Sequence, residues 1–331
     1  MKRLGQGGPG VSVLGFGCAG TAGTYGPVDR SESLATVVAA LDAGMTLVDT
    51  ADFYGMGRSE LMLAEVLRTR PREDVVLSVK FGAQRDPRGA FLGHDLSPAA
   101  AKTALAYTLT RLGTDYVDVY RPSRPDHVVP IEETIGAIGD LVDAGYVRHI
   151  ALSEAGPETI RRAHAERPLC DVQLEYSLLS RGIEEAILPV CRELGIGVTA
   201  YGVLSRGLLS GHWSPDRSFG RGDLRANLPR FQEGNVERNL ELVERLRPIA
   251  EARGATVAQL AIAWVASRGD DIVPLVGGRR PDQVAEAAAA GTLALTADDL
   301  AAIEAAVPAG AASGERYGPQ QMASLDSERG S

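Results

Sequence analysis

Residues 13–20 read VLGFGCAG, and the chain that follows them decides between two α/β folds. Gly15, Gly17 and Gly20 match the spacing G-x-G-x-x-G, which binds a dinucleotide where a strand turns directly into a helix. That mechanism needs a helix to begin at the third glycine. Here the chain continues as TAGTYGPVDR, with two more glycines and a proline before any helix can start. The glycine match alone is therefore weak evidence for a dinucleotide-binding half-sheet.

Short apolar runs alternate with amphipathic stretches along the whole chain. Strands are predicted at residues 11–17, 46–49, 75–80, 116–120, 148–152, 171–174, 196–200 and 272–276. Helices are predicted at residues 31–43, 59–69, 98–112, 131–144, 157–165, 182–194, 236–252, 256–268, 281–290 and 297–306. This alternation implies parallel strands joined by helical crossovers. Eight such units predict a (β/α)8 TIM barrel with extra helices and a long loop after the seventh strand.

Two segments fall outside the repeating pattern. Residues 1–310 are predicted to form a single barrel domain, and residues 311–331 a flexible C-terminal tail rich in small and charged residues. The loop 211–235 carries Trp213, Phe219 and Phe231 among arginines. These aromatic side chains are expected either to lie over a substrate or to pack the loop down.

Composition limits the class of protein. The 331 residues are 44% hydrophobic and 23% charged, with a net charge of −9 and no apolar run long enough to span a membrane. The acidic balance disfavours nucleic acid and anionic membranes as partners. Three separated cysteines do not suggest disulfides, and the five histidines show no metal-ligand spacing. A cytoplasmic enzyme that uses a small-molecule substrate and no metal is predicted.

Polar residues stand at seven consecutive strand ends, where barrels of this type build their active sites. Each has a structural explanation, such as a buried ion pair, but packing does not account for the whole series. The series consists of Asp49 with Tyr54, Lys80, Arg121 with Ser123 and Arg124, Ser153 with Glu154, Gln173, Tyr201, and Gly277 to Arg280.

The combination of Asp49, Tyr54 and Lys80 suits carbonyl reduction. A carbonyl that receives a hydride needs a proton at its oxygen, and a phenol with a pKa of about 10 is a poor donor unless a cation lowers that pKa. Lys80 is predicted to supply the cation and Asp49 to orient it. Only three of the 34 basic residues are lysines, and a guanidinium does not replace a compact ammonium at such a site.

The chain resembles the aldo-keto reductase family from about residue 2 to about residue 310. The resemblance lies in LGFGCAGTAGTYG, LVDTADFYGMGRSE, LSVKFG, RLGTDYVDVY, AGYVRHIALSE, QLEYSLLSR, TAYGVLSRGLLSG and VPLVGGRRPDQV, which stand in the family's order. The loop DLRANLPRFQEGN is similar to the branch that includes perakine reductase, and RPSR resembles pyridoxal reductase-like members. GFGCAG is thereby identified as the first barrel strand and its loop.

The resemblance implies NADPH-dependent reduction of an aldehyde or ketone, with Tyr54 as proton donor. It implies that Tyr201 stacks on the nicotinamide and that Ser153 and Gln173 hold the carboxamide. The stretch Gly202 to Leu208 would cover the pyrophosphate, and two arginines would bind the 2′-phosphate bidentately. The full implied cofactor set is Gly20, Thr21, Asp49, Ser153, Gln173, Tyr201, Gly202, Val203, Leu204, Arg206, Leu208, Gly277, Arg279, Arg280 and Gln283.

The sequence departs from the family pattern at three positions. Ser123 stands where the family has a catalytic histidine, Glu154 replaces an asparagine, and Ala287 replaces another near the adenine. Ser123 is expected to hold a water, or Arg121 or Arg124 to turn inward and assist; a return of His127 to the site is disfavoured.

Two other classes of function compete with a reductase. One is a regulatory cofactor binder resembling potassium-channel β subunits, for which the loss of the histidine leaves room. The other is an aldolase that uses Lys80 as a Schiff-base amine, which would leave Tyr54 and the arginine pair unexplained. The substrate is expected to be a small aromatic or heteroaromatic aldehyde such as pyridoxal, or a ketone.

Overall fold

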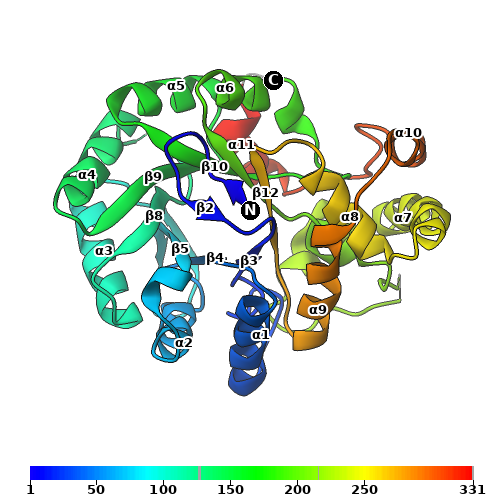
Figure 1. The fold of residues 1–331 in the computed structure, drawn as a ribbon, viewed down its shortest axis with the longest axis horizontal. Coiled ribbons are helices and arrows are strands. Elements are labelled where there is room, and N and C mark those ends of the chain that lie inside the picture. Colours follow the sequence, from blue (N-terminus) through cyan, green and yellow to red (C-terminus); the bar gives the residue numbers. More distant parts are fainter. Residues whose placement is uncertain (126–127, 215, 330–331) are drawn as a thin grey trace.

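The computed structural model describes residues 1–125, 128–214 and 216–329, and its centre is a closed barrel of eight parallel strands (Figure 1). The predicted barrel is confirmed. Neighbouring strands follow chain order around the ring, as expected when parallel strands are joined by helical crossovers. The strands are β3 (Gly15–Gly17), β4 (Leu47–Ala51), β5 (Val76–Phe81), β8 (Val117–Pro122), β9 (Val147–Ser153), β10 (Leu169–Glu175), β11 (Gly197–Tyr201) and β12 (Ile272–Val276).

Helices surround the barrel and match the predicted ranges to within a few residues, apart from one expected segment, 182–194, whose α-helix begins later. Two of them begin at side chains that cap the helix N-terminus. The Asp29 carboxylate accepts a hydrogen bond from the Glu32 amide, and the Ser97 hydroxyl accepts one from the Ala100 amide, with Pro98 as the first helical residue. The helices are α1 (Arg30–Asp42), α2 (Arg58–Leu67), α3 (Pro98–Leu112), α4 (Ile131–Asp143), α5 (Pro157–Glu166), α6 (Ile187–Glu193), α7 (Asn235–Ala252), α8 (Val257–Ala266), α9 (Pro281–Ala289), α10 (Ala297–Ala306) and α11 (Pro319–Ser324).

The first predicted strand, 11–17, is wrong in extent. Residues 10–11 instead form β2 (Gly10–Val11), which pairs with β1 (Lys2–Arg3) in an antiparallel hairpin, and only residues 15–17 enter the barrel. The hairpin lies across the N-terminal end of the barrel (Figure 1). There Leu4 and Val11 are fully buried against the interior side chains nearest to that end. The Lys2 ammonium donates to three backbone carbonyls next to β12, at 2.7–2.9 Å.

The barrel interior changes from apolar to polar along its axis. Near the hairpin it is filled by Leu47, Val119, Ala151, Val273 and Leu275. Two residues further along β4, β5 and β8, the inward positions become polar, because side chains on a strand alternate between the two faces. The polar positions are Asp49, Ser78, Lys80, Arg121, Asp171, Gln173 and Thr199.

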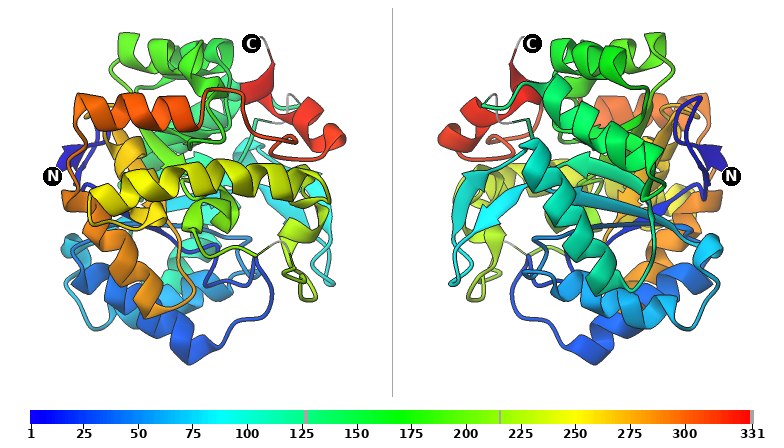
Figure 2. Two further views of the ribbon diagram at one scale, coloured as in Figure 1. Left: turned by 90° about the vertical axis from the view of Figure 1, so that its right-hand side faces the viewer. Right: turned by 90° about the vertical axis from the view of Figure 1, so that its left-hand side faces the viewer.

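The opposite end of the barrel is covered by segments outside the eight repeats. The hairpin of β6 (Ala83–Arg85) and β7 (Phe91–His94), the loop 211–235 and the C-terminal residues 311–329 all lie on this face, away from the N-terminus (Figure 2). In the predicted tail, Tyr317, Leu325 and Asp326 are buried, and residues 326–328 form a 3-10 turn. Within the described residues, no helix has the length and apolar character needed to cross a membrane.

Candidate active site

Asp49, Lys80 and Gln173 form one buried cluster at the C-terminal ends of β4, β5 and β10. The Lys80 ammonium is ion-paired with Asp49 and donates to Gln173 Oε1 at 3.1 Å. Asp49 Oδ1 accepts from Gln173 Nε2 at 2.9 Å and from Ser78 Oγ at 2.9 Å. Gln173, which the resemblance assigned to the carboxamide, thus uses its side-chain oxygen and nitrogen to hold the Asp49–Lys80 pair.

Tyr54 lies beside this cluster, on the loop that follows β4. The Lys80 ammonium is 5.0 Å from the centre of its ring. Burial raises the pKa of Tyr54 well above its usual value of 10, and the Asp49 carboxylate raises it further. The expectation that Lys80 lowers this pKa is wrong for the structure as it stands. The main cause is burial of the phenol, which disfavours its charged form, and the neighbouring Asp49 carboxylate adds to the effect.

Arg121 does turn into the barrel, where its guanidinium contacts other inward-facing side chains. Its guanidinium is fully buried, forms an ion pair with Asp171 at 2.9 Å, and donates to Thr199 Oγ1 at 3.2 Å and Ser78 Oγ at 2.8 Å. The contact with Asp171 is a close ion pair rather than an aligned hydrogen bond. Arg121 therefore supports the Asp49 cluster from within the barrel, through Ser78. These contacts do not support the expectation that Arg121 replaces the missing histidine.

Ser123, at the histidine position, is buried, and its hydroxyl has no hydrogen-bond partner among the described residues. Its backbone is fixed by a 2.8 Å hydrogen bond from its amide to the Phe81 carbonyl. Arg124, one residue on, lies with its guanidinium carbon 5.0 Å from the centre of the Tyr317 ring. His127 lies outside the described residues.

The implied nicotinamide residues meet at the ends of β9 and β11. Ser153 is buried, and the Tyr201 hydroxyl donates to Glu154 Oε1 at 2.8 Å. Burial would raise the pKa of Glu154, but Arg316, Arg124 and the Tyr201 hydroxyl together lower it to about 2. Glu154 is thus a charged hydrogen-bond acceptor that fixes the Tyr201 side chain at its hydroxyl group.

The stretch 202–208 has an unusual backbone. Gly202, Ser205, Arg206 and Gly207 all have positive φ, of 67°, 46°, 55° and 104°. Among the described non-glycine residues, the other positive values are at Met56 and Glu154, which also follow barrel strands. Backbone strain of this kind is concentrated where proteins bind ligands. Val203 and Leu208 are buried and anchor the turn, Leu204 is partly buried, and Arg206 pairs with Glu175 at 2.9 Å.

The implied phosphate residues lie together where β12 leads into α9. The Arg279 amide donates to Gln283 Oε1 at 2.8 Å, and the Arg279 side chain donates to the Tyr25 and Pro27 carbonyls. Arg280 pairs with Asp282 on the surface. A side chain at Gly20 would lie 3.3 Å from the Gly278 carbonyl, so the first loop, which includes Gly20 and the buried Thr21, closes onto Gly277 to Arg279.

The aromatic side chains of loop 211–235 pack on one another. The ring centres of Trp213, Phe219 and Phe231 are 5.0–6.0 Å apart. A short β-bridge joins Asp223 to Tyr25, so the loop is tied to the loop after β3. Of the two expectations for these aromatics, the structure favours packing of the loop itself.

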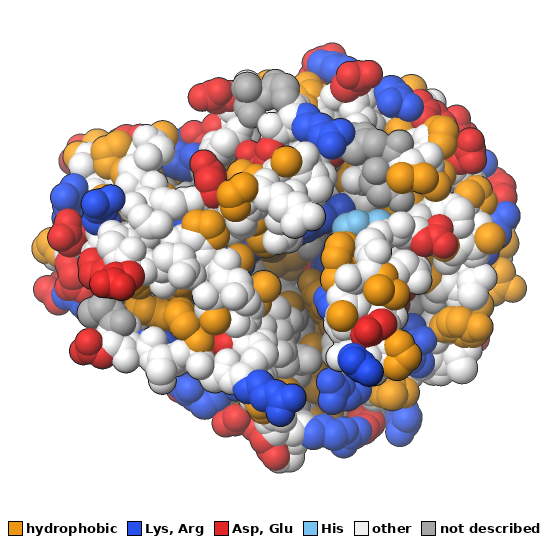
Figure 3. All heavy atoms as spheres, turned by 180° about the vertical axis from the view of Figure 1, so that it is seen from behind, with side chains coloured by type: hydrophobic (Ala, Val, Ile, Leu, Met, Phe, Trp, Pro, Cys, Tyr) orange, Lys and Arg blue, Asp and Glu red, His pale blue; other side chains and the backbone are white. Residues whose placement is uncertain are grey.

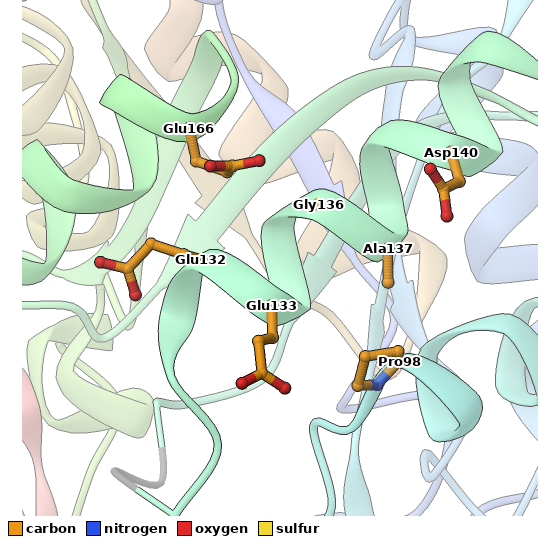
Figure 4. A pocket seen from close by; sticks show the side chains of 7 residues that line it. All are labelled: Pro98, Glu132, Glu133, Gly136, Ala137, Asp140 and Glu166. Atoms are coloured by element: carbon orange, nitrogen blue, oxygen red, sulfur yellow. The ribbon is translucent and has the colours of Figure 1, made fainter.

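The face that carries these residues is hollowed at its centre, with hydrophobic and basic side chains along the cleft (Figure 3). A second hollow, of about 400 Å³, lies on the outside of the barrel between α3, α4 and the end of α5 (Figure 4). Its carboxylates come from the outer helices, and it does not include any strand end. We assign no function to the outer hollow. It is lined by Pro98, Glu132, Glu133, Gly136, Ala137, Asp140 and Glu166.

Sequence reasoning missed Asp171, Arg316 and Tyr317. Asp171 is the first residue of a predicted strand and carries no local signal beyond being a charged residue in an apolar run. Arg316 and Tyr317 lie in the segment predicted to be flexible, yet both are buried against the Glu154 region. The flexibility of that segment stays a prediction, but its contacts belong to the site.

Asp52 gives a pH-dependent prediction. Burial and the nearby Glu60 raise the pKa of this carboxyl to about 7, against the opposing effect of Arg111, and its Oδ1 is buried without a partner among the described residues. Between about pH 4 and pH 7 the unfolded chain releases this proton and the folded chain retains it, so the Asp52 contribution to stability falls as pH rises.

We expect Asp52→Asn to raise the melting temperature relative to wild type at pH 8. The advantage should shrink steadily as the pH is lowered toward 4, because the wild-type carboxyl is then protonated in both states. Thermal unfolding of both proteins at four pH values measures this. An advantage that stays constant with pH would contradict the assignment.

Comparison with known proteins identifies the class. A model of the aldo/keto reductase family matches residues 13–308. A probable aldo-keto reductase 1 of Glycine max is 41% identical over 318 residues, which is 95% of this chain and 91% of that protein. The chain therefore belongs to the aldo/keto reductase family, whose members are oxidoreductases.

Solved structures agree with this. A glycerol dehydrogenase from Gluconobacter oxydans superposes with a TM-score of 0.84 at 30% identity, covering 92% of this chain and 94% of that one. An aldo-keto reductase from Klebsiella pneumoniae, solved in complex with NADPH, gives a TM-score of 0.74 at 26% identity, covering 93% and 96%.

Proposed function

We propose that this protein is an NADPH-dependent reductase of aldehydes or ketones, in which Tyr54 protonates the carbonyl oxygen. The observation that carries the proposal is the convergence of Tyr54 with the buried Asp49–Lys80–Gln173 cluster at the C-terminal ends of three strands. A phenol beside a buried ion pair is a positioned proton donor, and such a donor contributes about 10²–10⁴-fold to a reaction rate.

The residues present fit a nicotinamide dinucleotide phosphate. The turn 202–207 has the positive-φ backbone common at ligand sites, Gly20 lies close to the Gly278 carbonyl, and Arg279 and Arg280 stand at the N-terminus of α9. Bound NADPH supplies the hydride. Tyr201 would orient its ring, the turn would cover the pyrophosphate, and the two arginines would hold the 2′-phosphate.

Because burial and Asp49 raise the pKa of Tyr54, the phenol carries its proton at neutral pH, which is the form that reduction needs. The same shift makes the phenol a weaker acid, so its contribution as a donor depends on its position beside the carbonyl oxygen. The unpartnered Ser123 hydroxyl is suited to bind the carbonyl oxygen directly or through one water, in place of the family histidine. Lys80 and Asp49 keep the phenol in place and balance the charge around it.

NADPH oxidation by the purified protein tests the proposal, with pyridoxal, 4-nitrobenzaldehyde and a simple ketone as substrates. We expect turnover with at least one of them. Tight NADPH binding without turnover on any of the three would instead favour the regulatory cofactor binder.

Arg280 gives a separate prediction about cofactor choice. Arg280→Ala should raise the dissociation constant for NADPH by about tenfold, because a charge-assisted hydrogen bond to phosphate contributes roughly 1.5 kcal/mol or more. The dissociation constant for NADH, which lacks the 2′-phosphate, should be unchanged and serves as the internal control. Fluorescence titration with both cofactors measures it; an equal loss for both would argue against the assigned phosphate site.

A further inference from the structure

The C-terminal segment 315–328 is bound to the end of β9 by a dense set of contacts. Arg316 forms a bidentate pair with Glu154, with Nη2 at 2.6 Å from Oε2 and Nη1 at 3.2 Å from Oε1. Ser327 donates its hydroxyl to Glu154 Oε2 at 2.8 Å and its amide to the Glu154 carbonyl at 3.1 Å. The Gly156 amide donates to Asp326 Oδ2 at 2.6 Å.

Two features of β9 and its loop fit this docking. Glu154 has a φ of 54°, a conformation that costs a non-glycine residue energy and needs support from its surroundings. A side chain at Gly156 would lie 2.6 Å from the Asp326 carbonyl oxygen, so only glycine allows the segment to approach this closely.

The contacts continue from Glu154 to the ring of Tyr201. The Tyr201 hydroxyl, besides its bond to Glu154, lies 3.1 Å from the Tyr317 hydroxyl and 3.3 Å from Arg316 Nη1. The ring is therefore held at its hydroxyl by three groups, two of which come from the C-terminal segment. These bonds act at the edge of the ring and fix its tilt.

We propose that Arg316 is a positioning residue for the nicotinamide ring, and that segment 315–328 is a required part of the cofactor site. Arg316 acts through Glu154 and Tyr201 and does not itself contact the cofactor. The proposal rests on the function proposed above, in which Tyr201 stacks on the nicotinamide. The family match ends at residue 308, so Arg316 and segment 315–328 lie outside that match, whereas Glu154 and Tyr201 lie within it.

Two substitutions disturb the docking in different ways. Arg316→Ala removes the guanidinium and leaves Glu154 unpaired, whereas Gly156→Ala leaves both charges in place and displaces the backbone of residue 326. Arg329→Ala is the matched control, because Arg329 directly follows the segment but is exposed and donates to the Ala323 carbonyl, not to Glu154.

The experiment measures binding of NADPH and of adenosine 2′,5′-bisphosphate, which lacks the nicotinamide, to the full-length chain. We expect Arg316→Ala and Gly156→Ala each to raise the dissociation constant for NADPH about tenfold and to lower kcat by about 10- to 100-fold, since a small misplacement of a reacting group has effects of this size. Binding of the bisphosphate should change less than twofold, and Arg329→Ala should match wild type for both ligands.

Three results would overturn the proposal. These are NADPH binding and turnover as in wild type in both variants, an equal loss of both ligands, or a loss in Arg316→Ala alone, which would assign the effect to the unpaired Glu154 charge. Failure of the wild-type protein to bind or oxidise NADPH is a distinct result, which removes the proposed function and this inference with it.

Discussion

Tyr54→Phe is expected to lower kcat by about 10²–10⁴-fold, the range for loss of a positioned general acid. The substitution removes one hydroxyl and leaves the ring, which packs edge-on against Phe53 at 5.1 Å between centres. The Asp49–Lys80–Gln173 cluster keeps all of its hydrogen bonds, so the dissociation constant for NADPH should stay within about twofold of wild type. Steady-state kinetics and fluorescence titration measure the two quantities.

Tyr120→Phe is the matched control. Tyr120 is also buried, but its hydroxyl donates to the Ala101 carbonyl at 3.0 Å on the outer side of β8, toward α3. Its loss should lower stability by about 1 kcal/mol, the usual effect of one hydrogen bond, and leave kcat unchanged. Equal loss of kcat in the two variants would show that packing, and not proton donation, accounts for the Tyr54 result.

The pH dependence of the reaction follows from the same residue. Because the pKa of Tyr54 is raised above 10, kcat for reduction should not decline between pH 6 and pH 9 through loss of this proton. Oxidation of an alcohol needs the phenolate, so its rate should keep rising over that interval. Measuring both directions with one substrate pair tests this; a reduction rate that falls through pH 8 would indicate a lowered pKa.

Arg121→Met is expected to have the largest effect on stability, a loss of about 3–5 kcal/mol. The side chains of Arg121 and Asp171 are completely buried, and removing one partner leaves a buried charge without compensation. Burial raises the pKa of Asp171, against the lowering effect of Arg121, so the carboxyl already favours its neutral form more than usual. Without Arg121 that pKa should rise further, and the variant should become less stable as pH increases.

The exposed pair Arg167–Asp143 supplies the control, because its side chains are 39% and 62% exposed. Arg167→Met should lower stability by less than about 1 kcal/mol. The double variant Arg121→Met with Asp171→Leu should recover most of the loss, since no unpaired charge then remains. Urea denaturation of the four proteins measures these differences. Similar small losses for both single variants would mean that the buried pair is not an important brace.

The sequence was sufficient to predict the barrel and the residues that cluster at the ends of its strands, Asp49, Tyr54 and Lys80. Both depend on local patterns: eight alternations of strand and helix, and polar residues such as Asp49 and Lys80 where an apolar run ends. The glycine spacing at 15–20 is also local, and what distinguished it from a dinucleotide site was the absence of a helix start directly after Gly20. The first strand was predicted too long because Val11 and Val13 are both apolar, although Val11 ends β2 and Val13 lies in the bend before β3.

The parts that could not be predicted depend on contacts between distant residues. Arg121 and Asp171 are 50 residues apart, and only closure of the barrel shows that both face inward. The bond between Gly156 and Asp326 spans 170 residues. A tail of small and charged residues gives no periodic signal, so its docking cannot be inferred from composition. The direction of the Tyr54 pKa shift was mispredicted for a related reason: it depends mainly on how deeply the folded chain buries the phenol, which no local pattern shows.

The N-terminal hairpin and the C-terminal residues 311–329 lie at opposite faces of the barrel, and this determines where the protein can best be attached to something else. Arg316 and Tyr317 are among the last 16 residues of the sequence and are packed against Glu154 and Tyr201. An affinity tag, a fluorescent fusion partner or a solid support joined there would press on the catalytic face. The same addition ahead of Lys2 would extend from the opposite end of the barrel, which the hairpin of β1 and β2 covers. We therefore recommend that handles for purification or immobilisation be placed at the N-terminus.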